Sequence, residues 1–264
     1  MVLVAINGAA GRMGQRLVAL CAQDGELQLA AAIEHQGSVH LGQDAGTVAM
    51  VGTLGTVLTP RLEVAADVLV DFTTPSATRV ALKTCVDTET AMVIGTTGLS
   101  QADHEAIEQA AKSIPVLQSP NMSLGVNLMF ALVGQVAQRL GDDYDIELTE
   151  AHHRYKKDAP SGTALGLAEA ICEATGKDMN TDVVCGRHGP DVPRKRGQIG
   201  VHALRMGDVV GEHTARFAAL GERLEITHTA TTRDIFVRGA LVAAKWLAGQ
   251  KPGRYRMPDV LGLR

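Results

Sequence analysis

The amino-acid sequence predicts an α/β protein, with a doubly wound parallel sheet in a first domain and a mixed open sheet in a second, α+β domain. Two observations carry this prediction. Short runs of β-branched residues alternate with helical periodicity from Val2 to Leu117, whereas apolar and polar residues alternate with a period of two from Asp145 onward. Successive parallel strands need crossover helices of about the length that the intervening segments offer, so a doubly wound sheet is the economical arrangement.

The first domain is expected to open with a strand, a helix and a second strand, followed by a loop rich in glycine. Thr74-Pro75-Ser76 is typical of a helix start with proline in the first turn. Ser100 followed by Asp103 indicates a second helix start. The predicted strands are 2–6, 27–33, 68–72, 92–94 and 116–117, and the predicted helices are 12–23, 76–86 and 100–112.

The second domain is predicted from longer, half-exposed strands at 145–150, 200–205 and 223–228, with a helix at 161–175 among them. A last helix at 235–247 is apolar around most of its circumference. A helix of this kind must be buried, and we expect it to pack back against the first domain.

The composition favours a small-molecule partner. Of the 264 residues, 45% are hydrophobic and only 3% aromatic, which suits an aliphatic core between helices and a parallel sheet. A net charge of -4 gives no electrostatic footprint for nucleic acid or an anionic membrane. The opening apolar run ends at Asn7-Gly8, too early for a signal peptide, and no later run spans a bilayer. We therefore expect a cytoplasmic protein.

The four cysteines, Cys21, Cys85, Cys172 and Cys185, are scattered through the sequence without a CxxC pair. Neither a zinc site nor a short disulfide framework is indicated. We expect reduced cysteines that mostly fill the core, because free cysteine behaves as a small buried apolar residue. No metal site is expected.

The segment Gly8-Ala9-Ala10-Gly11-Arg12-Met13-Gly14 follows the first predicted strand and opens the first predicted helix. In this context the glycines are typical of a loop that wraps the pyrophosphate of a dinucleotide. Gly8 permits the tight turn, Gly11 lets backbone N–H groups approach a phosphate, and Gly14 lets the helix pack closely on the strand. A strand-to-helix turn without a ligand is the alternative, because turns also select glycine.

Glu34 ends the second predicted strand about 20 residues beyond this loop, where an acidic side chain accepts hydrogen bonds from the adenosine ribose. An acidic residue here favours NAD over NADP. His35 and Arg12 are nearby cations that could still meet a 2′-phosphate. The alternative for Glu34 is an ordinary solvated carboxylate.

A second cluster of titratable residues lies in the segment 150–163, between a predicted strand and a predicted helix start. Histidine, with an ordinary pKa of about 6.5, suits a group that gives or takes a proton during a reduction. His152 and His153 are adjacent in extended chain, so they should point opposite ways and differ in role. Lys156 adds a positive charge, and the helix start at 158–163 offers N–H donors to a carboxylate or phosphate.

A polar surface loop is the alternative for the two histidines, because histidine is often only partly buried. Metal binding by His152 and His153 is disfavoured, since neither a helical i, i+4 spacing nor a Cys/His cluster accompanies them. His202, His213 and His228 are interpreted as structural.

Taken motif by motif, the sequence closely resembles the dihydrodipicolinate reductases, which are the 4-hydroxy-tetrahydrodipicolinate reductases of the diaminopimelate route to lysine. The His-His pair with the downstream Lys and Ser-Gly-Thr is the specific part of the resemblance, because many dehydrogenases share the glycine loop. The other motifs are Val70-Asp71-Phe72-Thr73, Met92-Val93-Ile94-Gly95-Thr96-Thr97-Gly98, Gly125-Val126-Asn127, Glu150-Ala151-His152-His153, Gly207-Asp208 and Gly211-Glu212-His213-Thr214.

The resemblance implies NAD(P)H-dependent reduction of 4-hydroxy-tetrahydrodipicolinate to tetrahydrodipicolinate, with His152 as general acid/base and Lys156 as a proton donor. It also implies that His153, Gly162 and Thr163 contact the carboxylates of the substrate. The implied dinucleotide-binding residues are Gly8, Ala9, Ala10, Gly11, Arg12, Met13, Glu34 and His35, with Gly95, Thr96, Thr97, Ser119, Pro120, Asn121 and Met122 on the nicotinamide side.

By the same resemblance, residues 1–122, completed by 234–264, form a Rossmann-type dinucleotide-binding domain, and residues 123–233 form a substrate-binding domain that assembles a homotetramer. Two departures from the family pattern concern the cofactor. His35 stands where several members have Arg, and the segment 119–122, Ser-Pro-Asn-Met, replaces a more usual Ala-Ala-Asn-Phe. We therefore expect both cofactors to bind, with NADH at least as good as NADPH.

Two other functions compete with this hypothesis. Another two-domain dehydrogenase of amino-acid metabolism, such as a relative of aspartate or homoserine dehydrogenase, would keep the glycine loop. Such an enzyme has no evident need for His152, His153 and Lys156 in this arrangement. A dinucleotide-sensing regulator would bind NAD(H) without turnover, but the sequence has no helix-turn-helix or basic arm that would indicate one.

Overall fold

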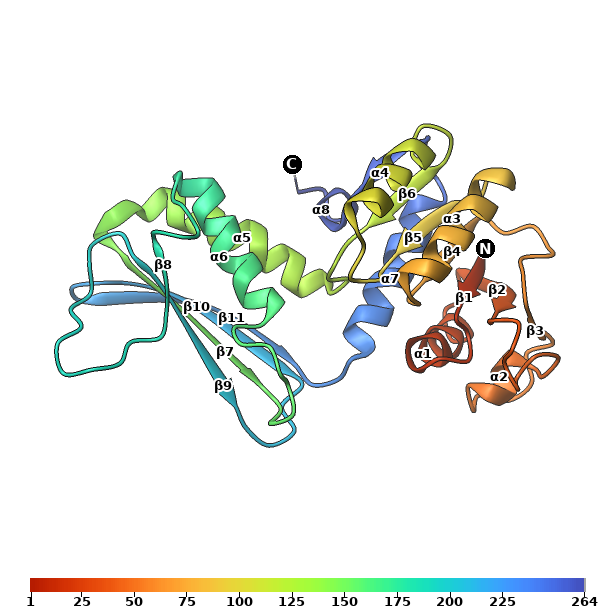
Figure 1. The fold of residues 1–264 in the computed structure, drawn as a ribbon, viewed down its shortest axis with the longest axis horizontal. Coiled ribbons are helices and arrows are strands. Elements are labelled where there is room, and N and C mark those ends of the chain that lie inside the picture. Colours follow the sequence, from red (N-terminus) through yellow and green to blue (C-terminus); the bar gives the residue numbers. More distant parts are fainter. Residues whose placement is uncertain (264) are drawn as a thin grey trace. The chain divides into compact units, whose positions relative to one another are not determined.

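The chain folds into two units (Figure 1). One consists of residues 1–124 and 234–263, and the other is Gly125–Arg233. The computed structural model describes residues 1–263, so Arg264, the last residue of the predicted first domain, lies outside the described residues.

The first unit is built on a parallel sheet in the order β12-β6-β5-β4-β1-β2-β3. The strand order reverses between β1 and β4, and an open α/β sheet binds its ligand at such a switch point, beyond the carboxyl ends of the strands. The strands are β1 (Val2–Asn7), β2 (Leu27–Ile33), β3 (Leu58–Thr59), β4 (Val68–Asp71), β5 (Ala91–Ile94), β6 (Pro115–Gln118) and β12 (Gly253–Tyr255). The helices are α1 (Arg12–Cys21), α2 (Ala45–Val48), α3 (Pro75–Asp87), α4 (Gln101–Ala110), α7 (Asp234–Leu247) and α8 (Met257–Val260).

Helices cover both faces of this sheet. Val68 and Val70 of β4 belong to a core shared with α1 and α7. Leu69, which points the opposite way, belongs to a second core shared with α3 and α4. Strands buried on both faces appear in sequence as continuous apolar runs, which is why they could be predicted. The predicted doubly wound sheet is confirmed, with its predicted strands and helices displaced by at most two residues at their ends.

The two predicted helix starts are confirmed as caps. Thr74 is the N-cap of α3, where its side chain accepts a hydrogen bond from Ala77 N, and Pro75 stands in the first turn. Ser100 and Asp103 form a capping box at α4: Asp103 N donates to Ser100 Oγ, and Ser100 N donates to Asp103 Oδ2. Each cap satisfies N–H groups that the helix itself leaves without acceptors.

The helix α7 returns to the first unit, as predicted. Val237, Ala240 and Leu247 are buried in the core on the α1 face. Gly239 lies against the backbone that leaves β6: a Cβ atom there would be 1.7 Å from the Met122 carbonyl oxygen. Glycine at this position therefore lets the segment that leaves the sheet pass directly over the helix.

The second unit is a mixed sheet in the order β11-β10-β7-β9-β8, with α5 and α6 on one face (Figure 1). β7 pairs parallel with β9 and antiparallel with β10. Ile146 and Leu148 of β7 pack against α5 and α6, whereas Glu147 and Thr149 point to the opposite face. The predicted mixed open sheet is confirmed. Its strands are β7 (Asp145–His152), β8 (Val183–Cys185), β9 (Ile199–Arg205), β10 (Gly211–Ala219) and β11 (Glu222–Ala230), and its helices are α5 (Leu124–Leu140), η1 (Gly141–Asp143) and α6 (Gly162–Thr175).

The cysteines do not form disulfides, and Cys21, Cys85 and Cys172 are buried whereas Cys185 is exposed. Burial raises the pKa of the Cys21 thiol to about 11 and that of Cys85 to about 12. These two thiols stay protonated at neutral pH and act as core-filling groups.

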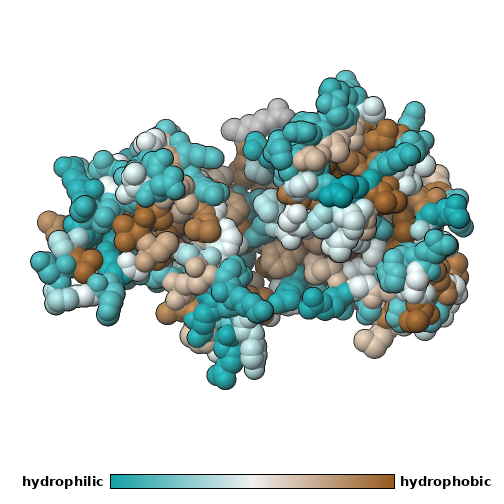
Figure 2. All heavy atoms as spheres, in the orientation of Figure 1, coloured by the Kyte–Doolittle hydropathy of each residue, from teal (hydrophilic) through white to brown (hydrophobic). Residues whose placement is uncertain are grey.

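Hydrophilic and hydrophobic residues are interspersed on the surface drawn in Figure 2. In the part of the chain that the structure describes, no helix combines the length and the apolar character needed to span a bilayer.

Candidate active site

The glycine loop joins β1 to α1 at the switch point of the first sheet. Gly8 has a φ of 73°, a left-handed conformation that glycine adopts without strain. A Cβ atom on Gly14 would lie 2.0 Å from the Gly8 carbonyl oxygen, so α1 starts too close to the strand for any side chain there. The N-cap residue of α1 is Gly11, which has no side chain to cap the first turn, and this suits the N–H groups of that turn to binding an anion. The predicted backbone roles of Gly8 and Gly14 are confirmed.

Asp71, at the carboxyl end of β4, ties this loop to the neighbouring strands. Its buried carboxylate accepts hydrogen bonds from Asn7 Nδ2 (2.8 Å), Thr73 Oγ1 (2.6 Å), Thr78 Oγ1 (2.5 Å) and Thr96 Oγ1 (2.8 Å). The Thr96 hydroxyl also accepts from Thr73 N at 2.9 Å. Because that hydroxyl is engaged within the protein, Thr96 would meet a ligand through its backbone.

Glu34 follows β2 and lies beside the glycine loop. Its Oε2 accepts a hydrogen bond from Ala10 N and its Oε1 accepts one from His35 N, each at 3.0 Å. The Glu34 side chain is 11% exposed, so the carboxylate is held in place rather than solvated. The structure thus brings together three of the residues predicted to bind the dinucleotide.

A cavity of about 400 Å³ opens beside Glu34. Apolar side chains from β2, β4 and α3 line it, together with Glu34, His35 and Arg61. An apolar pocket with a few polar groups at one end is the usual form of a small-molecule site.

The other predicted cofactor residues lie at the same edge of the sheet, after β5 and β6. Gly95 lies against the ring of Phe72, where a Cβ atom would be 2.4 Å from Cε1, and Thr97 is exposed. In the segment 119–122, Ser119 Oγ donates a hydrogen bond to the Asn121 carbonyl oxygen at 2.7 Å. The carboxyl ends of parallel strands meet at one edge, so these loops flank the switch point. Of the remaining predicted residues, Arg12 is exposed, Pro120 is exposed, Met13 is partly buried and Met122 is buried.

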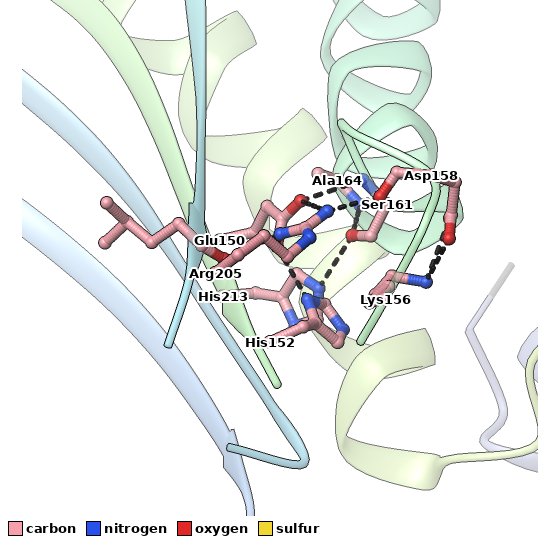
Figure 3. A network of polar contacts seen from close by, with 9 residues as sticks. Glu150, His152, Lys156, Asp158, Ser161, Ala164, Arg205 and His213 are labelled. Carbon is pink, nitrogen blue, oxygen red and sulfur yellow. Dashed lines mark hydrogen bonds and ion pairs between the residues drawn. The ribbon is translucent and has the colours of Figure 1, made fainter. Parts of the chain in front are cut away.

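His152 is the last residue of β7 in the second unit (Figure 3). Its Nδ1 lies 2.6 Å from Glu150 Oε2, and its side chain is 12% exposed. The His152 and His213 rings meet edge to face, with 5.2 Å between their centroids. The predicted acid/base residue is therefore held by a carboxylate on one side and by a second histidine on another.

Glu150 is a fully buried carboxylate that the surrounding groups keep ionised. Burial raises its pKa, but hydrogen bonds from Arg205, His152 and Ser161 N outweigh burial, and the net pKa is below the ordinary value. His213 is the opposite case, because burial and the nearby His152 lower its pKa to about 4. His213 is therefore neutral at physiological pH, and its Nε2 lies 3.2 Å from Ser161 Oγ.

Lys156 lies in the loop between β7 and α6 and pairs with Asp158 (Figure 3). Its Nζ donates to Asp158 Oδ1 at 2.8 Å and to Oδ2 at 2.9 Å. The hydrogen bond from Lys156 lowers the pKa of Asp158. The Lys156 side chain is 22% exposed and that of Asp158 is 59% exposed, so the pair is partly open to solvent.

The predicted substrate-binding residues flank this loop. His153 has a buried Nδ1 without a hydrogen-bond partner among the described residues, and its ring lies 6.4 Å from that of Tyr155. Gly162 and Thr163 form the first turn of α6, whose N-cap is Ser161. The first turn of a helix offers N–H donors to an anion, and a buried nitrogen without a partner is open to a polar ligand. Within residues 1–263, no three His, Cys, Asp or Glu side chains are grouped so as to hold a metal ion.

Comparison with known proteins identifies the family. Family models of the N-terminus and the C-terminus of dihydrodipicolinate reductase match residues 2–122 and 125–261. The chain belongs to the dihydrodipicolinate reductase family. The 4-hydroxy-tetrahydrodipicolinate reductase of Alkalilimnicola ehrlichii is 49% identical over 263 residues, 98% of each chain. That of Syntrophotalea carbinolica is 47% identical over 267 residues, covering both chains fully.

A solved dihydrodipicolinate reductase has the same fold. The dipicolinate-bound enzyme of Paenisporosarcina sp. TG-14 superposes with a TM-score of 0.79 over 98% of each chain, at 22% identity. The family predicted from the sequence motifs is confirmed, and the chain is an oxidoreductase whose first unit has the Rossmann NAD(P)-binding fold.

Two residues in these surroundings, Arg61 and Arg205, were not singled out from the sequence of this reductase-family member, and a third, His213, was given no role in the site. Arg61 reaches the cavity because β3 pairs with β2, which places residues after Thr59 next to Glu34. Arg205 reaches Glu150 because β9 pairs with β7. His213, interpreted from the sequence as structural, contacts the ring of His152. Only the alternation of His213 with Ala215 and Phe217 along β10 indicated that its ring points inward.

Proposed function

We propose that this chain catalyses the NAD(P)H-dependent reduction of 4-hydroxy-tetrahydrodipicolinate to tetrahydrodipicolinate, the reductase step of the diaminopimelate route to lysine. The overall reaction consumes NAD(P)H and a proton and releases NAD(P)⁺ and water. The observation that carries the proposal is His152, an acid/base group held by a buried carboxylate beside Lys156 and the N-terminus of α6. Family membership over the full chain supports the same reaction.

The residues of the first unit fit a dinucleotide. The uncapped first turn of α1 would hold the pyrophosphate, and Gly8 to Met13 would lie along it. Glu34 and the adjoining cavity would take the adenosine. The loops 95–97 and 119–122 would orient the nicotinamide, which supplies the hydride when bound. The unit formed by residues 1–124 and 234–263 would thus be the dinucleotide-binding domain.

The residues of the second unit fit a dicarboxylate and a proton transfer. Lys156, His153 and the first turn of α6, at Gly162 and Thr163, would bind the two carboxylates. His152 would then protonate the enamine-like carbon that the reduction leaves, with Lys156 offsetting negative charge on the substrate. Asp158 would position the Lys156 ammonium for this role.

Both cofactors are proposed to bind, with NADH at least as good as NADPH. Glu34 would accept hydrogen bonds from the ribose hydroxyls of NADH but repel a 2′-phosphate. His35 and Arg61 line the same cavity, where the Arg61 guanidinium would attract a 2′-phosphate and let NADPH bind as well. We expect kcat/KM for NADH to equal or exceed that for NADPH, measured in one buffer at one ionic strength. A clear preference for NADPH would contradict this assignment of Glu34.

The second unit is also proposed to assemble a homotetramer. In one chain α5 and α6 cover only one face of its sheet, and Leu204, on the uncovered face, is 51% exposed. Pairing of uncovered sheet faces would bury such residues. We expect light scattering to give a mass of four times 27.8 kDa. A monomer mass at micromolar concentration would contradict the tetramer.

One assay tests the proposed reaction. The protein is mixed with freshly generated 4-hydroxy-tetrahydrodipicolinate, and the absorbance of NADH or NADPH is followed, with substrate omitted as the control. We expect oxidation of both cofactors that depends on substrate. If neither cofactor is oxidised, the reductase proposal fails. Dinucleotide binding without turnover would then support a regulator, and turnover of aspartate or homoserine would support the rival dehydrogenases.

A further inference from the structure

We propose that Glu150, clamped by Arg205, is a positioning residue for His152. It fixes the imidazole with Nδ1–H as donor to the carboxylate, and so dedicates Nε2 to the transfer of a proton to substrate. The inference rests on the proposed function in one respect, the identity of His152 as the acid. Neither Glu150 nor Arg205 was given a role by the sequence motifs.

Every acceptor position of the Glu150 carboxylate is used. Oε2 accepts from His152 Nδ1 at 2.6 Å and from Arg205 Nη1 at 2.8 Å. Oε1 accepts from Arg205 Nη2 at 2.9 Å and from Ser161 N at 3.0 Å. Each oxygen of an ionised carboxylate has two lone pairs, so four donors saturate the group. A saturated and fully buried carboxylate cannot rotate without breaking several hydrogen bonds at once, which makes it a rigid support.

The charge of this network is balanced, which points to orientation as its role. Arg205 forms a bidentate pair with Glu150, and the same guanidinium donates to the Asp158 carbonyl oxygen. The negative charge that faces His152 is therefore compensated by a positive charge in direct contact. Glu150 therefore acts on His152 mainly as a hydrogen-bond acceptor whose position and direction are fixed. The contact of Arg205 with Asp158 also joins this support to the loop that carries Lys156 (Figure 3).

The second nitrogen of His152, Nε2, lies beside a glycine, and a neutral histidine packs against the ring. An ionised carboxylate only accepts hydrogen bonds, so the short contact with Glu150 requires a proton on Nδ1. Nε2 lies toward Gly211, where a Cβ atom would be only 3.2 Å away and the absence of a side chain leaves room. His213 forms the wall beside the ring and is neutral, so it offers no competing acid.

The direction of proton transfer agrees with this tautomer. When His152 acts as the acid, the Nε2–H bond breaks, its electron pair stays on Nε2, and a C–H bond forms on the substrate. The ring is then neutral with its proton on Nδ1, the form that Glu150 binds. The hydrogen bond at one nitrogen of a histidine decides which tautomer the ring adopts. The same support therefore holds the ring before and after the transfer.

Histidine NMR tests the orientation without any turnover. The protein is labelled with 15N-histidine, and the ring signals of His152 are identified as those lost in His152→Gln. In the wild-type protein, we expect the neutral ring to carry its proton on Nδ1. In Glu150→Gln, the side-chain amide presents a donor in place of one carboxylate oxygen, and we expect the Nε2-protonated tautomer to become populated. An unchanged tautomer in this variant would overturn the proposal.

Kinetics test the consequence for catalysis. In Glu150→Gln we expect kcat to fall by about 10- to 100-fold, with KM for the substrate changed by less than about threefold, because Lys156 and α6 are left in place. A kcat within twofold of wild type would overturn the proposal even if the tautomer changes. A rise in KM alone would assign Glu150 to substrate binding and would overturn it too. Failure of the wild-type enzyme to turn over would instead contradict the proposed function, while the NMR result would still decide the positioning.

Two further variants separate positioning from loss of structure. Glu150→Asp keeps the charge opposite Arg205 but is too short to reach His152 Nδ1, so we expect it to fold and to show the same tautomer change and loss of kcat. Glu147→Gln is the matched control. Glu147 is a carboxylate on the opposite face of β7 that pairs with Arg194 and, at 2.6 Å, with His202 Nε2. We expect Glu147→Gln to leave kcat and the His152 signals unchanged. An equal loss of kcat in both glutamine variants would make the effect structural and overturn the proposal.

Discussion

Replacement of His152 by glutamine is expected to lower kcat for reduction of 4-hydroxy-tetrahydrodipicolinate by about 10²- to 10⁴-fold, the usual contribution of a positioned general acid. Glutamine has a similar length and can still donate to Glu150, so the local fold should persist. It has no proton that it can release near neutral pH. Because Lys156 and the N-terminus of α6 are untouched, KM should change little. Steady-state rates at saturating NADH, with KM measured in parallel, provide the test.

His202→Gln is the matched control for this variant. His202 lies on β9, and its Nε2 is 2.6 Å from Glu147 Oε2, so it forms the same kind of carboxylate pair on the other face of the sheet. We expect His202→Gln to keep wild-type kcat. If His152→Gln turns over at the same rate as this control, His152 is not the acid, and Lys156 becomes the group to test next.

The elements that could be predicted from sequence are those whose signals are local. Gly8 is required by a positive φ, and Gly14 is required because α1 starts close to the end of β1. The spacing of the glycines in the sequence indicates both requirements. The caps at Thr74 and Ser100 are equally local. The helix α5 was not predicted, because Leu128 and Leu132 are apolar yet exposed and blur the helical period. Short strands such as β8 form only where a longer neighbour pairs with them.

The parts of the candidate site that could not be predicted depend on strand register. Glu150 and Arg205 meet because β7 and β9 pair in parallel with His152 opposite Arg205. A shift of one residue would turn Arg205 to the other face of the sheet. Arg61 reaches the cavity beside Glu34 only through the pairing of β2 with β3. Registers between distant strands leave no pattern in a single sequence, whereas the titratable residues of one loop can be recognised together.

Replacement of Gly14 by alanine is expected to raise the Kd for NADH by about tenfold or more, a change that corresponds to only about 1.4 kcal/mol. The new methyl carbon would lie 2.0 Å from the Gly8 carbonyl oxygen and 2.6 Å from Ala9 Cα, and both are backbone atoms that cannot move aside separately. The start of α1 must therefore shift away from β1, and its N–H groups move with it. Overpacking of this kind also costs about 1–3 kcal/mol of folding free energy. Fluorescence titration with NADH and thermal unfolding measure the two effects.

The control for Gly14→Ala is Gly25→Ala, the same substitution in the same unit. A Cβ atom on Gly25 would meet no atom within 4 Å, so neither NADH affinity nor Tm should change. Equal Kd values for the two alanine variants would mean that the loop relaxes around the new methyl group, and that the close contact of α1 with β1 does not position the pyrophosphate. If the Kd for NADH rises only in Gly14→Ala, and kcat at saturating NADH is unchanged because His152 still transfers a proton, the substitution acts on cofactor binding alone. The glycine loop and the histidine site would then be independent in energy, each carried by its own unit.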